Sequence, residues 1–357
     1  MQTKKMDQAK VDAFAGQMIG NLTGAAVTIL ASIGHQTGLF DTMAAMPAAT
    51  SEEIAKAAKL NERYVREWLA GMVTGKVVSY SPSTGKYRLP PEHAALLTRA
   101  AGAGNIASLA RYVPLLSSVE GKVVDSFKNG GGVSYSEYAR FREVMAERSA
   151  QSNDATLIES TLPLVPGLVK KLKTGIDVAD FGSGTGHAIN LMAKAFPKSR
   201  FTGFDFWDEG ISAGRAEAKK IGVRNANFTV SDVTTINMSN AFDLITAIDA
   251  IHDQAQPHKV LKNISRALRP DGTFLMVDTA CSSKLEENLD HPLATFLYWA
   301  SVMHCLTLSL SLKGEGLGTM WGEQKAKELL AEAGFNRVLV KHVDGDIRDC
   351  YFIARKR

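Results

Sequence analysis

The second half of the sequence alternates between strand-like and helix-like segments, and this alternation limits the fold more than any other feature. From residue 176 onward, amphipathic stretches separate short apolar runs, the first five of which are IDVADF, RFTGFDF, NFTVSD, FDLITAIDA and GTFLMVDT. The pattern predicts parallel strands joined by helices that cover both faces of one sheet. Ligands of such α/β sheets bind at the carboxyl ends of the strands, so we expect the functional site there.

A glycine-rich loop directly follows the first predicted strand. Glycines let the backbone turn tightly and approach a ligand closely. A dinucleotide-binding fingerprint would need a glycine at position 187, where this chain has His187. The spacing is instead acid-x-Gly-x-Gly-x-Gly, which predicts a ligand-binding loop, with a purely structural turn as the alternative. The candidate binding residues of the loop are Asp180, Gly182, Ser183, Gly184 and Gly186.

Acidic residues also follow the next three predicted strands. At the end of the second strand, the carboxylate of Asp205 can accept hydrogen bonds from both hydroxyls of a ribose. Taken one at a time, each of these acids has an alternative role as a helix N-cap. Together they extend the predicted cofactor site by Asp205, Phe206, Asp232, Val233 and Asp249.

These motifs resemble those of the class I S-adenosylmethionine (SAM)-dependent methyltransferases, as does the segment Leu268-Arg269-Pro270-Asp271-Gly272 before the fifth strand. The chain as a whole is similar to bacterial two-domain small-molecule methyltransferases with an N-terminal winged-helix dimerisation domain; GGGVSYSEYARFREVMAE and GLGTMWG also fit that group. The resemblance implies a Rossmann-like, seven-stranded, mostly parallel sheet whose last strand is antiparallel. It also implies SAM as methyl donor, with S-adenosyl-L-homocysteine as product, and an adenine contact from Asp232.

The first hundred residues have a helix, helix, hairpin pattern. Thr50 and Asn61 are candidate helix caps, and the strand-like runs VVSYS and KYRLP enclose a Pro-Ser-Thr-Gly turn. We predict a mainly helical winged-helix-like dimerisation domain over 1–100, a helical linker and substrate cap over 101–175, and a SAM-binding domain over 176–357 with a lid insertion at about 282–320. The apolar run from Ile19 to Gly34 favours a homodimer.

The segment after the fourth strand holds the candidate catalytic residues. His252 titrates near neutral pH and is a candidate general base, with Asp253 to orient it. The alternative is that His252 only packs against the cofactor or caps a turn. His304 is the rival base. The predicted reaction is an in-line displacement, which requires aligned reactants and exclusion of water. No metal-ligand spacing is evident, so we expect no metal in the mechanism.

The two helical inserts supply the candidate acceptor-binding side chains, for which core packing is the alternative. An apolar pocket with a few polar groups suits a small molecule carrying a nucleophilic oxygen or sulfur, such as a phenol, a hydroxy acid or a small thiol. A small-thiol S-methyltransferase is the narrower alternative. The candidate substrate residues are Tyr135, Tyr138, Phe141, His291, Tyr298, Trp299, Met303, Met320 and Trp321.

Other classes of function remain open from the sequence: a SAM-responsive winged-helix DNA-binding regulator, and a non-catalytic SAM-binding subunit. The net charge is only +4, and the candidate recognition helix mixes Arg63 and Arg66 with glutamates, so we expect no nucleic-acid partner. Three widely spaced cysteines and the absence of a secretory pattern predict a cytoplasmic enzyme. The apolar stretch from Pro292 to Leu312 holds His304 and several hydroxyl residues, which favours a buried or lid helix over a membrane span.

Overall fold

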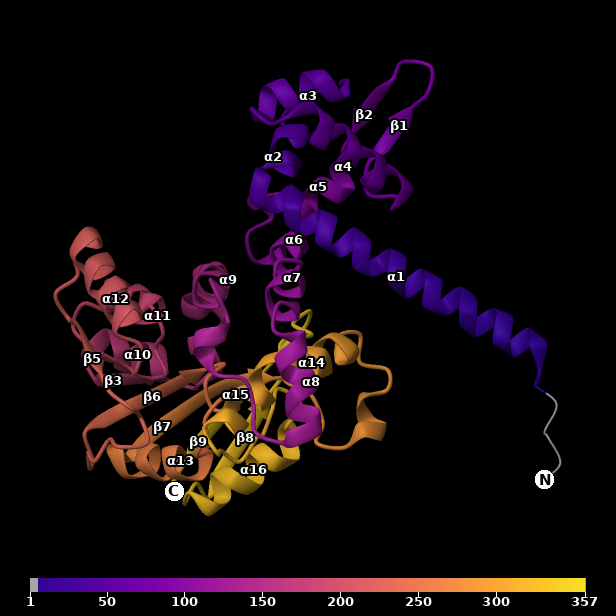
Figure 1. The fold of residues 1–357 in the computed structure, drawn as a ribbon. Coiled ribbons are helices and arrows are strands. Elements are labelled where there is room, and N and C mark those ends of the chain that lie inside the picture. The colour runs from indigo at the N-terminus through magenta and orange to yellow at the C-terminus, as the bar shows by residue number, and fades with distance from the viewer. Residues whose placement is uncertain (1–5, 357) are drawn as a thin grey trace, which may run out of the picture. The chain divides into compact units, whose positions relative to one another are not determined.

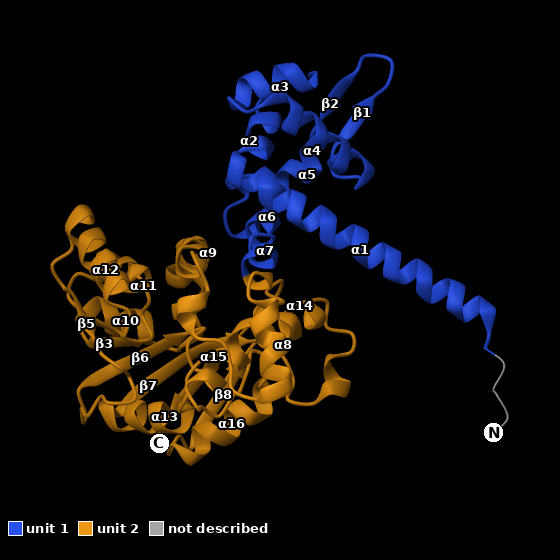
Figure 2. Cartoon of the chain, in the orientation of Figure 1, with its two compact units in different colours: residues 1–115 blue, residues 116–357 orange. Residues whose placement is uncertain are grey.

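The computed structural model describes residues 6–356. The chain divides into two compact units, residues 1–115 and 116–357 (Figure 2).

The first unit is mostly helical and carries a small hairpin (Figure 1). A capping box at Thr50 and Glu53 begins one helix, and the Asn61 side chain caps the next, as the sequence predicts. Trp68 and Leu69 are buried in its core. Its elements are α1 (Gln8–Thr37), α2 (Leu39–Ala44), α3 (Ser51–Ala58), α4 (Glu62–Thr74), β1 (Ser79–Ser81), β2 (Lys86–Arg88), α5 (Pro91–Leu97), a 3₁₀ helix (Arg99–Gly104) and α6 (Ile106–Leu109), while α7 (Tyr112–Ser117) crosses the boundary.

Helix α1 is largely exposed along its length, and its buried residues all lie in the C-terminal part. Among the described residues it is the one helix that is long and apolar enough to cross a membrane, judged by length and composition alone. Most of its exposed large apolar side chains follow helical spacing and form a stripe, while the exposed Ile19 lies off this line. We call the set the α1 stripe: Val11, Phe14, Met18, Leu22, Ile29 and Ile33.

The second unit is built on a seven-stranded sheet in the order β5-β4-β3-β6-β7-β9-β8. Strands β3 to β7 pair in parallel, and β9 runs antiparallel to both β7 and β8. This arrangement confirms the predicted α/β sheet with an antiparallel last strand. The strands are β3 (Asp177–Phe181), β4 (Arg200–Asp205), β5 (Ala226–Val230), β6 (Phe242–Ile248), β7 (Leu268–Thr279), β8 (Arg337–Lys341) and β9 (Asp349–Arg355).

One boundary differs from the prediction. Strand β7 begins at Leu268, so the segment Leu268–Gly272 lies inside the strand and not before it. Phe242 pairs with Leu268, and Leu244 already pairs with Thr273. The extra residues between these pairs are accommodated in a bulge, and Arg269 in the bulge forms ion pairs with Asp177 and Asp243.

Helices cover both faces of the sheet (Figure 1). One face packs against α13 (Pro257–Ala267) and α16 (Gly322–Glu332), around Phe274 and Phe335. The other packs against α10 (Leu168–Thr174), α11 (His187–Ala195) and α12 (Asp208–Ile221). Strand order reverses at β3, whose neighbours are β4 and β6, so the ligand crevice is expected at the carboxyl ends of these strands.

Two helical inserts pack together above these strand ends. The first contains α8 (Glu120–Asn129), a 3₁₀ turn (Tyr135–Glu137), α9 (Phe141–Thr156), a π-helical turn (Leu157–Thr161) and a 3₁₀ turn (Leu162–Leu164). The second runs from a 3₁₀ turn (Leu285–Asn288) through α14 (Ala294–Ala300) and a π-helical turn (Ser301–Cys305) to α15 (Leu306–Ser311). The Val133 amide donates to the Thr307 carbonyl, and a Cβ on Gly132 would lie only 1.9 Å from that oxygen, so glycine permits this close approach.

Candidate functional site

The glycine loop after β3 has the conformation that its residues require. Gly182, Gly184 and Gly186 all have positive φ, at 85°, 55° and 69°. A Cβ on Gly186 would lie 2.2 Å from the Phe228 ring, so this glycine is needed for packing. A Cβ on Gly184 would meet no atom of the described chain within 4 Å, so its exposed side is open to a ligand.

Asp205 joins this loop to the end of β4. Its carboxylate accepts hydrogen bonds from the Gly184 amide at 2.7 Å and the Trp207 amide at 2.9 Å. Burial raises the pKa of this carboxyl group, and the two amide donors oppose that rise. The Ser183 hydroxyl is buried and has no partner among the described residues, while the Phe206 side chain is exposed. The loop region therefore combines an anchored carboxylate, a buried hydroxyl without a partner among the described residues, and a glycine with open space beside it.

The other acidic residues of the predicted cofactor site have partners within the protein. Asp180 is buried, accepts a hydrogen bond from the Thr246 hydroxyl at 2.7 Å, and has a pKa raised to about 7 by burial. Asp232 is exposed and accepts from the Thr234 amide, next to the buried Val233. Asp249 has a positive φ of 50°, and its carboxylate lies 3.9 Å from the Arg348 guanidinium.

His252 follows β6 and is buried against the end of β7. Its Nδ1 lies 2.8 Å from Oδ1 of Asp278, while its Nε2 lies 3.4 Å from Oδ1 of Asp253. The Trp321 indole and the Thr279 amide also donate to Asp278 Oδ1, at 3.1 and 2.8 Å. Asp278 is therefore the side chain that holds the His252 ring, and Asp253 faces the opposite nitrogen.

Opposing effects act on the charge of His252. Burial disfavours the imidazolium, but the negative charges of Asp278 and Asp253, with the hydrogen bond to Asp278, together raise the pKa of His252 well above its usual value. A neighbouring carboxylate thus strengthens this imidazole as a base.

His304 has a different environment in the π-helical turn. Its ring packs on Phe141 with centroids 4.0 Å apart, and also contacts the rings of Tyr135 and Tyr138. Burial lowers the pKa of His304 to about 4, and its Nε2 has no partner among residues 6–356. At neutral pH His304 is uncharged and is a much weaker base than His252.

The first insert contributes aromatic side chains beside His304. The Tyr138 hydroxyl donates to the Met303 carbonyl at 2.6 Å, so it links the first insert to the π-helical turn. The guanidinium of Arg142 lies 4.2 Å from the centre of the Tyr135 ring and 4.9 Å from that of Trp207. Burial raises the pKa of the Tyr135 hydroxyl, which is therefore protonated at neutral pH.

The predicted substrate residues fall into two sets. Tyr135, Tyr138, Phe141 and Met303 lie around His304, and Trp321 reaches the His252 site through Asp278. Met320 is buried next to Trp321. For the remaining three, the contacts described are with residues nearby in sequence, or the side chain is exposed. The His291 ring accepts a hydrogen bond from the Leu293 amide, Trp299 packs on Phe296, and Tyr298 is partly exposed.

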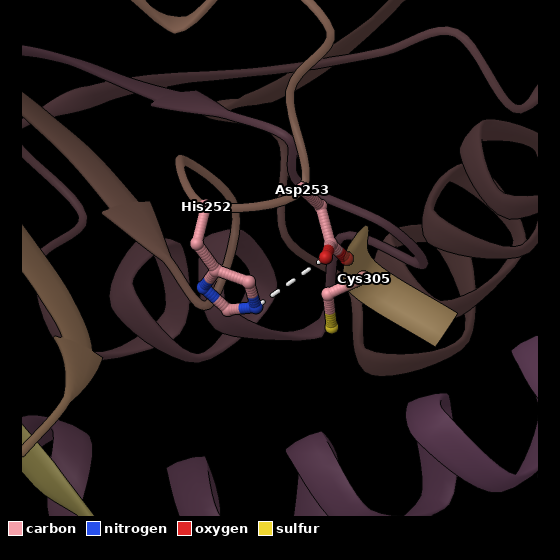
Figure 3. Close-up of side chains that lie close together, drawn as sticks. All are labelled: His252, Asp253 and Cys305. Atoms are coloured by element: carbon pink, nitrogen blue, oxygen red, sulfur yellow. Dashed lines mark ion pairs between the residues drawn. The ribbon is translucent and has the colours of Figure 1, made fainter. Parts of the chain in front are cut away.

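A third side chain completes the surroundings of the His252 Nε2 atom. One ligand-type atom from each of His252, Asp253 and Cys305 lies within 4.8 Å of the other two (Figure 3). Burial raises the pKa of the Cys305 thiol to about 11, so the thiol is protonated at neutral pH. Cys305 comes from the π-helical turn, and the two other residues come from the loop that follows β6.

Three residues of the site, Asp278, Cys305 and Arg142, were not predicted from the sequence. Asp278 had a usable signal, because it is the acid near the end of the fifth strand, just as Asp205 ends the second. Cys305 and Arg142 had none, because their roles depend on how the inserts pack over the sheet.

Two parts of the chain match known protein families. Residues 25–99 match an Rv2258c-like winged HTH domain, and residues 172–334 match a methyltransferase domain. A malonyl-[acyl-carrier protein] O-methyltransferase from Bacillus cereus is 26% identical over 147 residues, or 41% of this chain. The matched segment covers 49% of that protein, so the chain spans about half the length of this curated relative.

Solved structures are similar to this chain over nearly its whole length. Human N-acetylserotonin methyltransferase in complex with SAM is 17% identical, with a TM-score of 0.69 and 100% of both chains covered. A structure of PigF with SAH is 18% identical, with a TM-score of 0.71, covering 99% of this chain and 100% of that one. At these identities the similarity shows the fold alone, and it extends over both units of the chain.

Proposed function

We propose that this chain is a SAM-dependent methyltransferase that acts on a small molecule. The chain joins a winged helix-turn-helix domain to a class I methyltransferase domain, as its motifs predict. The acceptor atom is an oxygen or a sulfur with a proton to lose. The observation that most supports the proposal is the hydrogen bond from the Gly184 amide of the glycine loop to the Asp205 carboxylate. This contact lies where the strand order of the α/β sheet reverses.

The residues of this loop fit the proposed cofactor. Asp205 ends β4, where a carboxylate can take the two hydroxyls of a ribose, and Gly184 leaves open space beside it. The unpartnered Ser183 hydroxyl is a free hydrogen-bonding group in the same loop. When bound, SAM supplies an electrophilic methyl group on a sulfonium. The chain must hold the acceptor in line with that group and keep water out.

His252 is the residue we propose as general base. Its ring is fixed through Nδ1 by Asp278, which leaves Nε2 to accept the acceptor's proton. Asp278 also stabilises the imidazolium that forms. Asp278 is therefore a positioning residue in this proposal. The low pKa of His304 argues against that ring as the base and in favour of a packing role beside the acceptor.

The cover over this site is aromatic. Tyr135, Tyr138 and Phe141 surround His304, and such a lining favours a flat or apolar acceptor with few charges. A hydroxyl acceptor needs the base at every turnover, whereas a thiol ionises near neutral pH and needs less help.

We propose that the first unit serves to form a homodimer. On α4, which would be the recognition helix of a DNA-binding protein, Arg63 pairs with Glu67 and Arg66 with Glu62. Paired arginines offer little net charge to phosphates, which argues against a DNA-binding regulator. The α1 stripe offers an apolar surface that a second copy of the chain would cover.

Calorimetric titration with SAM tests the proposal. Wild-type protein should bind one equivalent of SAM. Asp205→Ala removes charge-assisted hydrogen bonds to the ribose worth about 1.5–3 kcal/mol each, so the loss of even one of them should lower SAM affinity roughly 10- to 150-fold. Gly184→Val places a side chain in the open space at a φ that favours glycine, and should abolish measurable binding.

Two matched variants serve as controls. Gly222→Val introduces a similar backbone strain, at φ 76° with open space, but at the end of α12 and outside the loop. Asp208→Ala removes an exposed carboxylate close to Asp205 in sequence. Both should bind SAM like the wild type. Equal SAM affinity in Asp205→Ala, Gly184→Val and the wild type would refute the proposed cofactor site.

A further inference from the structure

We propose that His252, Asp253 and Cys305 form a binding site for a soft divalent metal ion such as Zn²⁺. The three side chains bring an imidazole nitrogen, a carboxylate oxygen and a sulfur within 4.8 Å of one another, and two of the three residues are buried (Figure 3). Imidazole and thiolate ligands select Zn²⁺ over Mg²⁺ and Ca²⁺, which prefer oxygen ligands alone.

The spacing of the ligand atoms suits tetrahedral zinc. With Zn–N and Zn–O bonds of about 2.0–2.2 Å, two ligand atoms at a tetrahedral angle lie about 3.4 Å apart. His252 Nε2 and Asp253 Oδ1 are 3.4 Å apart. With a Zn–S bond of about 2.3 Å, the sulfur should lie about 3.5 Å from the other two ligand atoms, so Cys305 Sγ needs a shift of about 1.3 Å or less to complete the geometry.

Outer contacts already orient two of the ligands. Metal-binding histidines usually donate their second ring nitrogen to a carboxylate, and His252 Nδ1 is hydrogen-bonded to Asp278 in this manner. Cys305 Sγ lies 3.6 Å from Nδ1 of His304, which can donate to a thiolate. Asp253 Oδ1 is buried and has no hydrogen-bond partner among the described residues, so a cation would satisfy it.

Metal binding would have a defined consequence. The ion would take the lone pair of His252 Nε2 and displace the thiol proton of Cys305 to solvent, and three protein ligands would leave a fourth position open. The same nitrogen is the proposed base, so Zn²⁺ would inhibit methyl transfer; this last step rests on the proposed function, whereas the binding site itself does not.

Metal titration of the full-length, chelator-treated protein tests the site directly. Calorimetry with Zn²⁺ should give one equivalent per chain. Co²⁺ should give a thiolate-to-metal charge-transfer absorption, which reports a cysteine ligand without any activity measurement. Cys305→Ser should abolish that absorption and weaken Zn²⁺ binding. Asp278→Asn should weaken Zn²⁺ binding by about 10- to 100-fold, the usual effect of losing an outer-shell partner.

Cys281→Ser is the matched control, because its thiol lies outside the cluster; it should keep both signals. His252→Gln provides a second ligand variant, and thermal melting of each protein shows whether it has folded. Equal Zn²⁺ affinity in the wild type, Cys305→Ser and His252→Gln, or a Co²⁺ complex without charge-transfer absorption, would overturn the proposal. SAM titration of the same samples reports separately on the proposed function.

Discussion

At the scale of single residues, the two histidines near the proposed methyl acceptor differ in their neighbours. His252 has Asp278 at Nδ1 and Asp253 near Nε2, whereas His304 is surrounded by aromatic rings. Carboxylates stabilise an imidazolium and aromatic burial does not, so the pKa values of the two rings move in opposite directions. Only His252 combines basicity with an anchored orientation.

Substitution of each histidine should separate these roles. His252→Ala should lower turnover by about 10²- to 10⁴-fold, the usual contribution of a general base, with SAM affinity kept. His304→Asn should cost much less, since it removes a weak base. Steady-state release of S-adenosylhomocysteine with small phenols, hydroxy acids and thiols is the measurement. A large loss in His304→Asn together with full activity in His252→Ala would transfer the role to His304.

The pH dependence of activity should reflect the effect of the Asp278 charge on His252. The base acts when it is neutral, and the raised pKa of His252 keeps it protonated to a higher pH than an ordinary histidine. Activity of the wild type should therefore rise with pH through a pKa above about 6.5. Asp278→Asn removes the charge that favours the imidazolium, so the rise should move to lower pH, with a lower plateau because the ring is less well held.

This profile should be measured in the presence of a chelator, so that bound metal does not compete with protons at His252. Asp253→Asn should move the profile in the same direction, since Asp253 also raises this pKa. A wild-type profile that is flat with pH, or an Asp278→Asn profile shifted to higher pH, would contradict the assignment of His252 as base.

At the scale of elements, the sequence located the strand ends but not the packing of the inserts. The glycine loop was predictable because its positive φ angles require glycine, and Asp205 was predictable because it ends an apolar strand. The π-helical turn Ser301–Cys305 was not, because its residues have the pattern of an ordinary helix. That turn faces Tyr138, which is far away in sequence, and only the folded chain brings the two together. Cys305 was missed for the same reason.

The hydrogen bond between these elements should affect local stability. Tyr138→Phe removes the donor to the Met303 carbonyl, and a hydrogen bond of this kind contributes about 0.5–1.5 kcal/mol. Amide hydrogen exchange in residues 301–311 should therefore become about 2- to 13-fold faster. Tyr64→Phe, at a highly exposed position in α4, is the control and should leave that segment unchanged. Unchanged exchange in Tyr138→Phe would mean that apolar packing alone holds the turn.

At the scale of the whole molecule, the central question is what covers α1. Thirty helical residues extend about 45 Å, and most of that length has no cover within its own unit. An exposed apolar stripe of this size is costly in water and marks an interaction surface. A second copy of the chain and a lipid surface are the two candidates, and they differ in a measurable way.

We expect the second copy. Full-length protein should be a dimer by light scattering at micromolar concentration. Phe14→Glu combined with Leu22→Glu places two charges in the α1 stripe, at positions exposed in the single chain, so the variant should fold and become a monomer. Gln17→Glu combined with Thr23→Glu places the same charges on α1 about 120° away from the stripe and should leave the dimer intact. Co-sedimentation of the wild type with phospholipid vesicles tests the other candidate. A wild type that is monomeric alone and sediments with vesicles would assign the stripe to a membrane surface.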